Sequence, residues 1–232
     1  MRKVFRSRGI RFDVNGKFVS EKRYFEPDIY HLSQYDNLKD CFLRWDCFEY
    51  AVKVGTESVD SVNFHTDMTT HNPSDLILQD VFSIEKIRKI FDDSFKAYTI
   101  GMRLAGNEII GQSIYYYPSI LKTNRYGIKG ITNPLVINVE CSRLLKYLDI
   151  DDERYIKYVN MITKLKGFSV TKNQYRKVSY KLYAYVEDDK LFDLFENKNA
   201  VEKCFREYGK TKLTSMRIMD GKVTGINLYF IE

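Results

Sequence analysis

The feature that most constrains the fold is a repeated hairpin pattern. Residues 102–118 (MRLAGNEIIGQSIYYYP) align without a gap with residues 216–232 (MRIMDGKVTGINLYFIE). Each segment has an alternating run, a tight turn and a second alternating run. The turn is Gly106-Asn107 in the first segment and Asp220-Gly221 in the second, and such pairs are typical of two-residue hairpins. Each segment therefore predicts two antiparallel strands.

The pattern occurs three more times. Residues 15–26 (NGKFVSEKRYFE) align with the segment that starts at Asp220, and residues 168–186 (FSVTKNQYRKVSYKLYAYV) form a further copy. A weaker copy covers residues 51–67, with a turn near Gly55-Thr56-Glu57. An internal repeat of this kind is a strong indication of architecture. We expect five hairpins.

The segments between the hairpins have apolar residues at helical spacing. Ser83 is a candidate N-cap for one of them, Gly167 ends another and Gly209 ends the last. The expected helical stripes are Leu38, Cys41, Phe42 and Trp45; Ile84, Ile87, Phe91 and Phe95; Leu144, Leu145 and Leu148, continued by Tyr155, Val159, Ile162 and Leu165; and Leu191, Leu194, Phe195, Val201, Cys204, Phe205 and Tyr208.

Five hairpins supply ten antiparallel strands. The unpaired backbone groups at the two edges of such a sheet must be covered or paired. An open sheet of that width curls or splits, whereas a closed barrel has no edge. We therefore expect an α+β fold in which ten strands close into a barrel and the helices lie outside. The chain has no Pro-, Gly- or Ser-rich linker, so residues 1–232 are expected to form one domain.

Strand alternation predicts which side chains enter the barrel. If Lys181 points inward, Tyr183 and Tyr185 do too, while Leu182 and Ala184 face the helices. The cations on the first strands of three hairpins can join the inner set; these are Lys53, Arg103 and Arg217. The same inward and outward alternation, applied to the second strands of other hairpins, places further residues inside: Lys22, Tyr24, Ser113, Tyr115, Tyr117, Asn227 and Tyr229.

This arrangement resembles the ABBA-type prenyltransferases, and within them the compact cyanobactin-type peptide prenyltransferases. The resemblance is carried by the helix and hairpin alternation, by Lys-x-Tyr at Lys22 and Lys181, and by the rhythm of IGMRLAGNEIIGQSIYYYPS and KVGTESVDSVNFHTD. The chain departs from the family in being shorter and in beginning with a hairpin. Lys is also replaced at Ser113 and Asn227, and the weak copy reads Val62-Asn63-Phe64.

The resemblance implies transfer of an allylic isoprenoid, from dimethylallyl or geranyl diphosphate, to a small aromatic or peptide acceptor inside the barrel. Inward cations would bind the diphosphate, because a leaving group needs positive charge where its own charge develops. Inward tyrosines would shield the allylic cation with their ring faces. The residues so implied are Arg103, Lys181, Arg217, Lys53 and Lys22 for the diphosphate, and Tyr115, Tyr183, Tyr229, Tyr24, Tyr117 and Tyr185 for the isoprenoid.

The resemblance does not identify the general base or decide whether Mg²⁺ accompanies the diphosphate. Three acidic residues on or near hairpin turns are candidates for the base: Asp13, Glu57 and Glu108. The acidic runs at 149–153 and 187–189 fit helix N-termini better than a metal site, because carboxylates there meet the positive end of the helix dipole.

Other sequence features argue against several protein classes. His31, His65 and His71 lack metal-site spacing, and the four cysteines form neither a zinc motif nor a disulfide framework, which fits a reducing cytoplasm. No apolar run approaches the length of a membrane helix. Two alternatives stay open: a non-catalytic barrel that binds a phosphorylated or lipid ligand, and a nucleic-acid-binding module. The second is less favoured, because the 37 basic residues are mixed with 31 acidic ones.

Overall fold

The computed structural model describes residues 4–56, 58–65, 95–118, 130–175, 177–211 and 213–231. Ten strands form one sheet, and each pairs antiparallel with its neighbours. The strands are β1 (Phe5–Phe12), β2 (Phe18–Phe25), β3 (Asp46–Lys53), β4 (Val59–His65), β5 (Phe95–Ala105), β6 (Glu108–Pro118), β7 (Ile162–Asn173), β8 (Val178–Val186), β9 (Leu213–Met219) and β10 (Lys222–Ile231).

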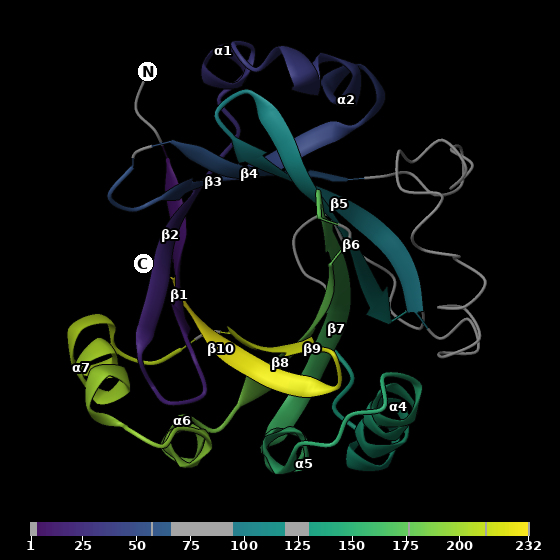
Figure 1. Cartoon of the computed structure of the whole chain (residues 1–232), viewed down its shortest axis with the longest axis vertical. Helices are drawn as coiled ribbons and strands as arrows, with labels where there is room; N and C mark the ends of the chain where they lie inside the picture. The colour runs from purple at the N-terminus through teal and green to yellow at the C-terminus, as the bar shows by residue number, and fades with distance from the viewer. Residues whose placement is uncertain are drawn as a thin grey trace.

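The sheet closes on itself. β1 pairs with β10 from Ser7 opposite Ile231 to Phe12 opposite Ile226, so neither terminal strand leaves a free edge. Consecutive strands are neighbours throughout, and the five predicted hairpins therefore follow one another around the ring (Figure 1). The last hairpin turns at Asp220-Gly221, where both residues have positive φ, as its sequence predicted. The expected ten-stranded barrel is confirmed.

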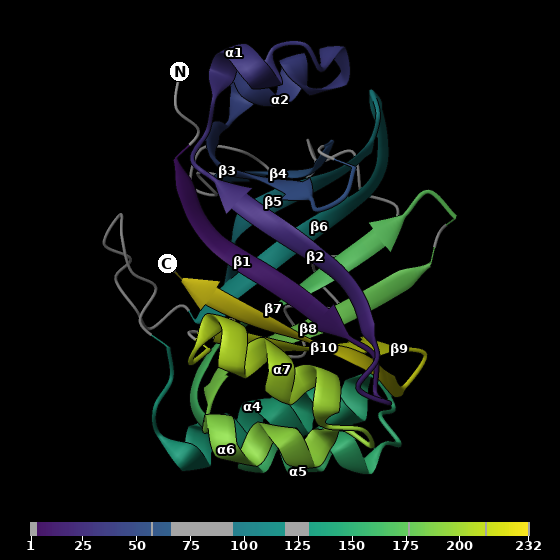
Figure 2. The ribbon, with the colours of Figure 1, turned by 90° about the vertical axis from the view of Figure 1, so that its left-hand side faces the viewer.

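The helices lie outside the barrel (Figures 1 and 2). The short elements α1 and α2 pack over one side, and α4 to α7 pack over the opposite side. Among the described residues, none of the helices has both the length and the apolarity needed to cross a membrane. The helical elements are α1 (Ile29–Leu32), η1 (Asp36–Leu38), α2 (Lys39–Arg44), α4 (Pro134–Tyr147), α5 (Glu153–Asn160), α6 (Asp188–Leu191), η3 (Phe192–Leu194) and α7 (Asn199–Tyr208).

The apolar core lies between the strands and these helices. One cluster joins β1 and β6–β10 to α4–α7, and it includes Ile114, Leu182 and Leu228, which are almost fully buried. A second cluster joins β3–β5 to η1 and α2 around Phe64 and Leu38. Alternation then turns the other side chains of each strand toward the lumen, which is why the lumen is polar.

Two sequence-based helix boundaries are wrong. Ile162, Leu165 and Gly167, which the apolar spacing assigns to the end of a helix, belong to strand β7, because α5 ends at Asn160. Spacings of three and four residues continue across this boundary, so periodicity alone could not separate helix from strand there. Phe95 begins strand β5 and is not helical, and the remainder of that stripe, from Ile84 to Phe91, lies outside the described residues.

Candidate functional site

The lumen contains two adjoining cavities at different depths. Antiparallel pairing puts all five hairpin turns at one end of the barrel and all the longer connections at the other. The cavity near the hairpin turns, of about 290 Å³, is called the cation chamber here. The cavity near the longer connections, of about 530 Å³, is called the glutamate chamber after Glu49. Both are lined by Tyr24, Asn63, Tyr115, Tyr183 and Tyr229.

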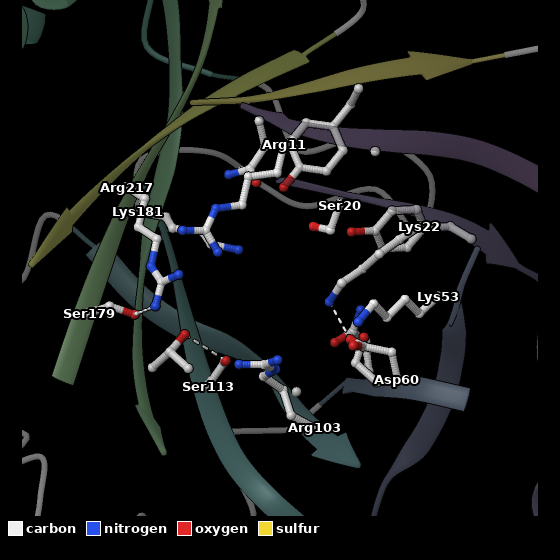
Figure 3. A pocket seen from close by; sticks show the side chains of 18 of the residues that line it. Arg11, Ser20, Lys22, Lys53, Asp60, Arg103, Ser113, Ser179, Lys181 and Arg217 are labelled. Carbon is white, nitrogen blue, oxygen red and sulfur yellow. Dashed lines mark hydrogen bonds and ion pairs between the residues drawn. The ribbon is translucent and has the colours of Figure 1, made fainter. Parts of the chain in front are cut away.

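Positive charge dominates the cation chamber (Figure 3). Six basic side chains from six strands line it: Arg11, Lys22, Lys53, Arg103, Lys181 and Arg217. Among the described residues that line this chamber, Asp60 is the one carboxylate, and it forms an ion pair with Lys22. Hydroxyl groups lie between the cations: Arg217 Nη2 donates to Ser179 Oγ at 3.4 Å.

The cations of this chamber are poorly compensated. The Nε atoms of Arg11, Arg103 and Arg217 are buried and have no hydrogen-bond partner within the described part of the chain. Burial, together with the neighbouring Lys22 and the arginines, lowers the pKa of Lys181 to about 7. Burial and the other two arginines lower the pKa of Arg217 to about 10. Buried like charges and unsatisfied donors are costly, so the chamber is built for an anion with several oxygen atoms.

Four tyrosines form a ring between the two chambers, called the tyrosine ring here. The rings of Tyr24 and Tyr229 have centroids 6.1 Å apart, those of Tyr229 and Tyr183 6.4 Å, and those of Tyr183 and Tyr115 6.0 Å. They occupy matching positions on the second strands of four hairpins, which brings them to one level. The hydroxyl groups of Tyr183 and Tyr229 lie 3.3 Å and 3.4 Å from serine hydroxyls of β7 and β9.

Glycines on the first strands make room for these rings. A Cβ atom on Gly9 would lie 3.0 Å from Cε2 of Tyr24 and 3.2 Å from Cε1 of Tyr229. A Cβ atom on Gly101 would lie 3.2 Å from Cε2 of Tyr115. All three distances are tighter than ordinary contacts, so any other residue at Gly9 or Gly101 would displace the tyrosines.

The fifth hairpin position of the ring carries Asn63, and a carboxylate lies beside it. Asn63 Nδ2 donates a 3.0 Å hydrogen bond to Oε1 of Glu49, which projects from β3 into the glutamate chamber. Burial raises the pKa of Glu49 to about 7, although the Asn63 hydrogen bond and the charge of Arg6 act in the opposite direction. A carboxylate with this pKa can accept a proton near neutral pH.

The glutamate chamber is more apolar and aromatic than the cation chamber. Tyr117 and Tyr185, which were predicted to line the isoprenoid site, lie here and not in the cation chamber. Burial raises the pKa of Tyr117 to about 12. The Lys166 ammonium lies 5.1 Å from the Tyr185 ring centroid, within range of a cation–π contact.

The structure brings together the cations that the sequence singled out. Lys22, Lys53, Arg103, Lys181 and Arg217 all line the cation chamber, and Lys53 lies at its exposed rim. Their role in diphosphate binding stays a prediction.

The predicted general bases are placed less favourably. Asp13 accepts hydrogen bonds from the backbone N–H groups of Asn15 and Lys17 in the first hairpin turn. Glu108 is exposed at the start of β6, and neither residue lines the two lumen chambers. Glu57 lies outside the described residues. The placements of Asp13 and Glu108 do not favour them as the base, and Glu57 stays a prediction, whereas Glu49 faces the lumen.

Sequence reasoning missed Arg11, Asp60 and Glu49. A signal for Arg11 existed, because Gly9-Ile10-Arg11 has the same spacing as Gly101-Met102-Arg103. Glu49 lies four residues before Lys53 and therefore shares its inward phase.

A metal-binding acidic cluster is not supported. Among the described residues, no group of three His, Cys, Asp or Glu side chains could hold a metal ion. The acidic runs lie at helix N-termini, as predicted: Asp152 caps α5 by accepting from the N–H of Arg154, and Asp188 and Asp189 lie in the first turn of α6. Mg²⁺ prefers several oxygen ligands, and the single carboxylate of the cation chamber is already paired with Lys22. The chamber residues therefore do not fit a protein-held Mg²⁺ site.

No protein-family model matches the sequence, and no curated protein matches it. The crystal structure of 6-dimethylallyltryptophan synthase from Micromonospora olivasterospora, in complex with DMASPP and Trp, is similar with a TM-score of 0.57 at 11% identity. The match covers 97% of this chain and 81% of that one. The crystal structure of AnaPT from Neosartorya fischeri matches with a TM-score of 0.49 at 9% identity, covering 97% of this chain and 77% of that one.

The closed ten-stranded barrel with outer helices matches the fold of the 6-dimethylallyltryptophan synthase, an ABBA prenyltransferase. The fold expected from the resemblance is therefore confirmed. At these identities the likeness shows the fold alone, so a nearest relationship to the cyanobactin-type enzymes and the activity itself stay predictions.

Proposed function

We propose that this protein is a prenyltransferase that moves an allylic isoprenoid from its diphosphate to an aromatic or peptide side-chain acceptor inside the barrel. The observation that carries the proposal is the order of features along the lumen. The cation chamber, the tyrosine ring and the glutamate chamber follow one another. The three features match, in that order, a diphosphate, an allylic cation and a nucleophile that must lose a proton.

The cation chamber provides for the leaving group. When the allylic C–O bond breaks, its electron pair leaves with the diphosphate oxygen, where negative charge increases. Arg11, Arg103 and Arg217 offer Nε–H donors that have no partner in the described part of the chain, and Lys181 adds a point charge. Fixed hydrogen-bond donors aimed at developing charge make the largest single contribution to the rate enhancement of many enzymes. These cations would supply that charge without a protein-held Mg²⁺ ion.

The tyrosine ring provides for the cation. Each ring face attracts a nearby cation by roughly 0.5–2 kcal/mol, and more where water is excluded. Tyr24, Tyr115, Tyr183 and Tyr229 surround one level of the lumen and are held by buried contacts. The same rings would keep water from capturing the allylic carbon, which would otherwise give the free prenyl alcohol.

The glutamate chamber provides for the acceptor. The nucleophile's electron pair forms the new bond to the allylic carbon, and the proton it loses passes to the carboxylate of Glu49. The raised pKa of Glu49, about 7, suits a general base at neutral pH. Aromatic side chains from several strands would stack against an aromatic acceptor; they are Phe48, Tyr117 and Tyr185. The similar synthase from Micromonospora olivasterospora was solved in complex with Trp, which supports an aromatic acceptor here.

Binding and product analysis test the proposal together. Calorimetry should detect dimethylallyl or geranyl diphosphate binding, while single-stranded oligonucleotides should not bind. Incubation with an acceptor pool of cyclic and linear peptides containing Tyr, Trp, Ser or Arg, and with free aromatic amino acids, should yield a product heavier by one prenyl group. Diphosphate binding without transfer to any acceptor would favour the second candidate, a ligand-binding barrel, because both share the cation chamber. No binding at all would overturn both.

A further inference from the structure

The tyrosine ring is interrupted at one position. Four hairpins contribute Tyr24, Tyr115, Tyr183 and Tyr229, and β4 contributes Asn63. Asn63 is 7% exposed and lines both chambers. A short amide in place of a ring leaves an opening between the chambers on the side where Glu49 lies. The nucleophile of an acceptor has to meet the allylic carbon through such an opening.

The two ends of the Asn63 amide have different surroundings. Its Nδ2 donates to Glu49 Oε1 at 3.0 Å, and this hydrogen bond fixes the orientation of the amide. Its Oδ1 is buried and has no hydrogen-bond partner among the described residues. The neighbouring residue is Gly101, whose added Cβ would lie 2.7 Å from Oδ1, so the glycine leaves space there, and no described residue donates to Oδ1.

A buried carbonyl oxygen without a donor costs roughly 1–3 kcal/mol. In the four other hairpins the chain fills this level with a tyrosine, so the retention of an unsatisfied amide at one position calls for a ligand. A ligand group that supplies an N–H or O–H donor would satisfy Oδ1. Such a group would at the same time lie beside the Glu49 carboxylate.

We propose that Asn63 is a positioning residue: its Nδ2 holds Glu49 as the carboxylate, and its Oδ1 receives an N–H or O–H of the acceptor at the opening in the tyrosine ring. This inference rests on the proposed prenyl transfer. It adds that the acceptor group carries a hydrogen-bond donor at or next to its nucleophilic atom. Asn63 itself neither takes a proton nor touches the leaving group.

The hydrogen bond from Asn63 lowers the pKa of Glu49 against the effect of burial, so its loss should raise that pKa. Other polar groups also face Glu49 or share its chamber and must stay unchanged in the comparison. They are Arg6 and Ser7 of β1, Tyr24 of β2, Cys47 of β3, Thr99 of β5, Tyr115 and Tyr117 of β6, Lys166 of β7, Tyr183 and Tyr185 of β8 and Tyr229 of β10.

The experiment compares Asn63→Leu, which removes both amide ends at similar volume, with Asn63→Asp, which keeps the shape but replaces the donor by a second ionisable carboxyl beside Glu49. In both variants, the midpoint of the rising limb of kcat/KM against pH should move upward. At neutral pH, kcat/KM should fall about 10- to 100-fold, as for loss of a hydrogen bond to a charged group. Binding of the dimethylallyl diphosphate by Asn63→Leu should change less than about threefold, because this replacement alters no charge in the lumen.

Asn227→Leu is the matched control, since Asn227 is also a lumen amide, but it donates to Ser215 and lies in the cation chamber. Its pH midpoint should match the wild type. NMR of ¹³C-labelled glutamate, assigned with Glu49→Gln, measures the Glu49 midpoint without turnover. An unshifted NMR midpoint in Asn63→Leu would overturn the inference and leave prenyl transfer standing. Absence of transfer by the wild type would overturn the proposed function and the acceptor contact of Asn63, while NMR still decides its contact with Glu49.

Discussion

Lys181 of β8 and Arg217 of β9 lie directly opposite each other in the sheet, and both side chains line the cation chamber. Two cations at paired positions repel, and Arg217 contributes, after burial and Lys22, to the lowered pKa of Lys181. The first prediction follows from this relationship. Replacing Arg217 or Arg103 by Met should weaken binding of dimethylallyl diphosphate by about 1.5–3 kcal/mol, the range for a hydrogen bond to a charged group.

Calorimetry measures this loss, and Lys157→Met is its control, because Lys157 is exposed on α5 outside the barrel. Without ligand, the arginine variants should be no less stable than the wild type, because each removes a repulsive charge. Equal binding by wild type and both arginine variants would show that the diphosphate does not lie in this chamber.

The second prediction concerns Lys181 and pH. Its pKa in the folded protein is about 7, below the ordinary 10.5, so the unfolded chain holds the proton more tightly. Between these values the free energy of unfolding should therefore fall as the pH falls, and the Lys181 contribution should level off below about 7. In denaturant titrations at pH 7 and 10, Lys181→Met should lack this pH-dependent part of the free energy of unfolding. A bound diphosphate should raise the lowered pKa of Lys181 again, so that binding above pH 7 takes up a proton. Calorimetry in buffers of different ionisation enthalpy measures this uptake.

Much of the barrel could be predicted from local patterns. The alternation of each strand and the turn at Asp220-Gly221 are set by neighbouring residues, so hairpins and inward phases are visible in the sequence. Arg11 follows the same rule, but its strand precedes the segment, residues 15–26, that resembles the last hairpin. The end of α5 at Asn160 was not visible, because the apolar spacing of the helix runs on into β7.

The site chemistry depends on contacts that a sequence does not record. Asp60 reaches the cation chamber at a register shift between β3 and β4, which breaks the simple alternation. The pKa of Glu49 depends on burial and on Asn63, fourteen residues away along the chain. Barrel closure brings these groups together, and only the closed structure makes the carboxylate of Glu49 a better base candidate than the turn residues Asp13 and Glu108.

The third prediction tests that choice of base. Glu49→Gln should lower kcat by about 10²–10⁴-fold, the usual contribution of general acid–base catalysis, while diphosphate binding persists. The wild-type rate should rise with pH through about 7 as the carboxylate loses its proton. Glu108→Gln is the matched control and should retain activity, because Glu108 is exposed at the start of β6 and lines neither chamber. Equal loss in both variants, or none in Glu49→Gln, would reject Glu49 as the base.

The same residue predicts a stability effect of opposite sign to that of Lys181. The folded-state pKa of Glu49, about 7, lies above its ordinary 4.5, so the folded protein holds this proton more tightly than the unfolded chain. The free energy of unfolding should therefore fall as the pH rises from about 4.5 to 7. Glu49→Gln should remove that dependence in denaturant titrations. A variant that keeps the full wild-type slope would show that another group is responsible.

The last prediction concerns water exclusion by the tyrosine ring. Tyr183 lies between Tyr115 and Tyr229, and its hydroxyl is 3.3 Å from Ser169 Oγ. Tyr183→Phe keeps the ring face and loses only the hydroxyl contact, so the loss of rate should be modest, about tenfold or less. Tyr183→Ala should open the ring and divert product toward the free prenyl alcohol, because water then reaches the allylic carbon. Chromatography of both products measures the ratio. The same alcohol fraction in Tyr183→Ala as in the wild type would show that the ring does not protect the cation.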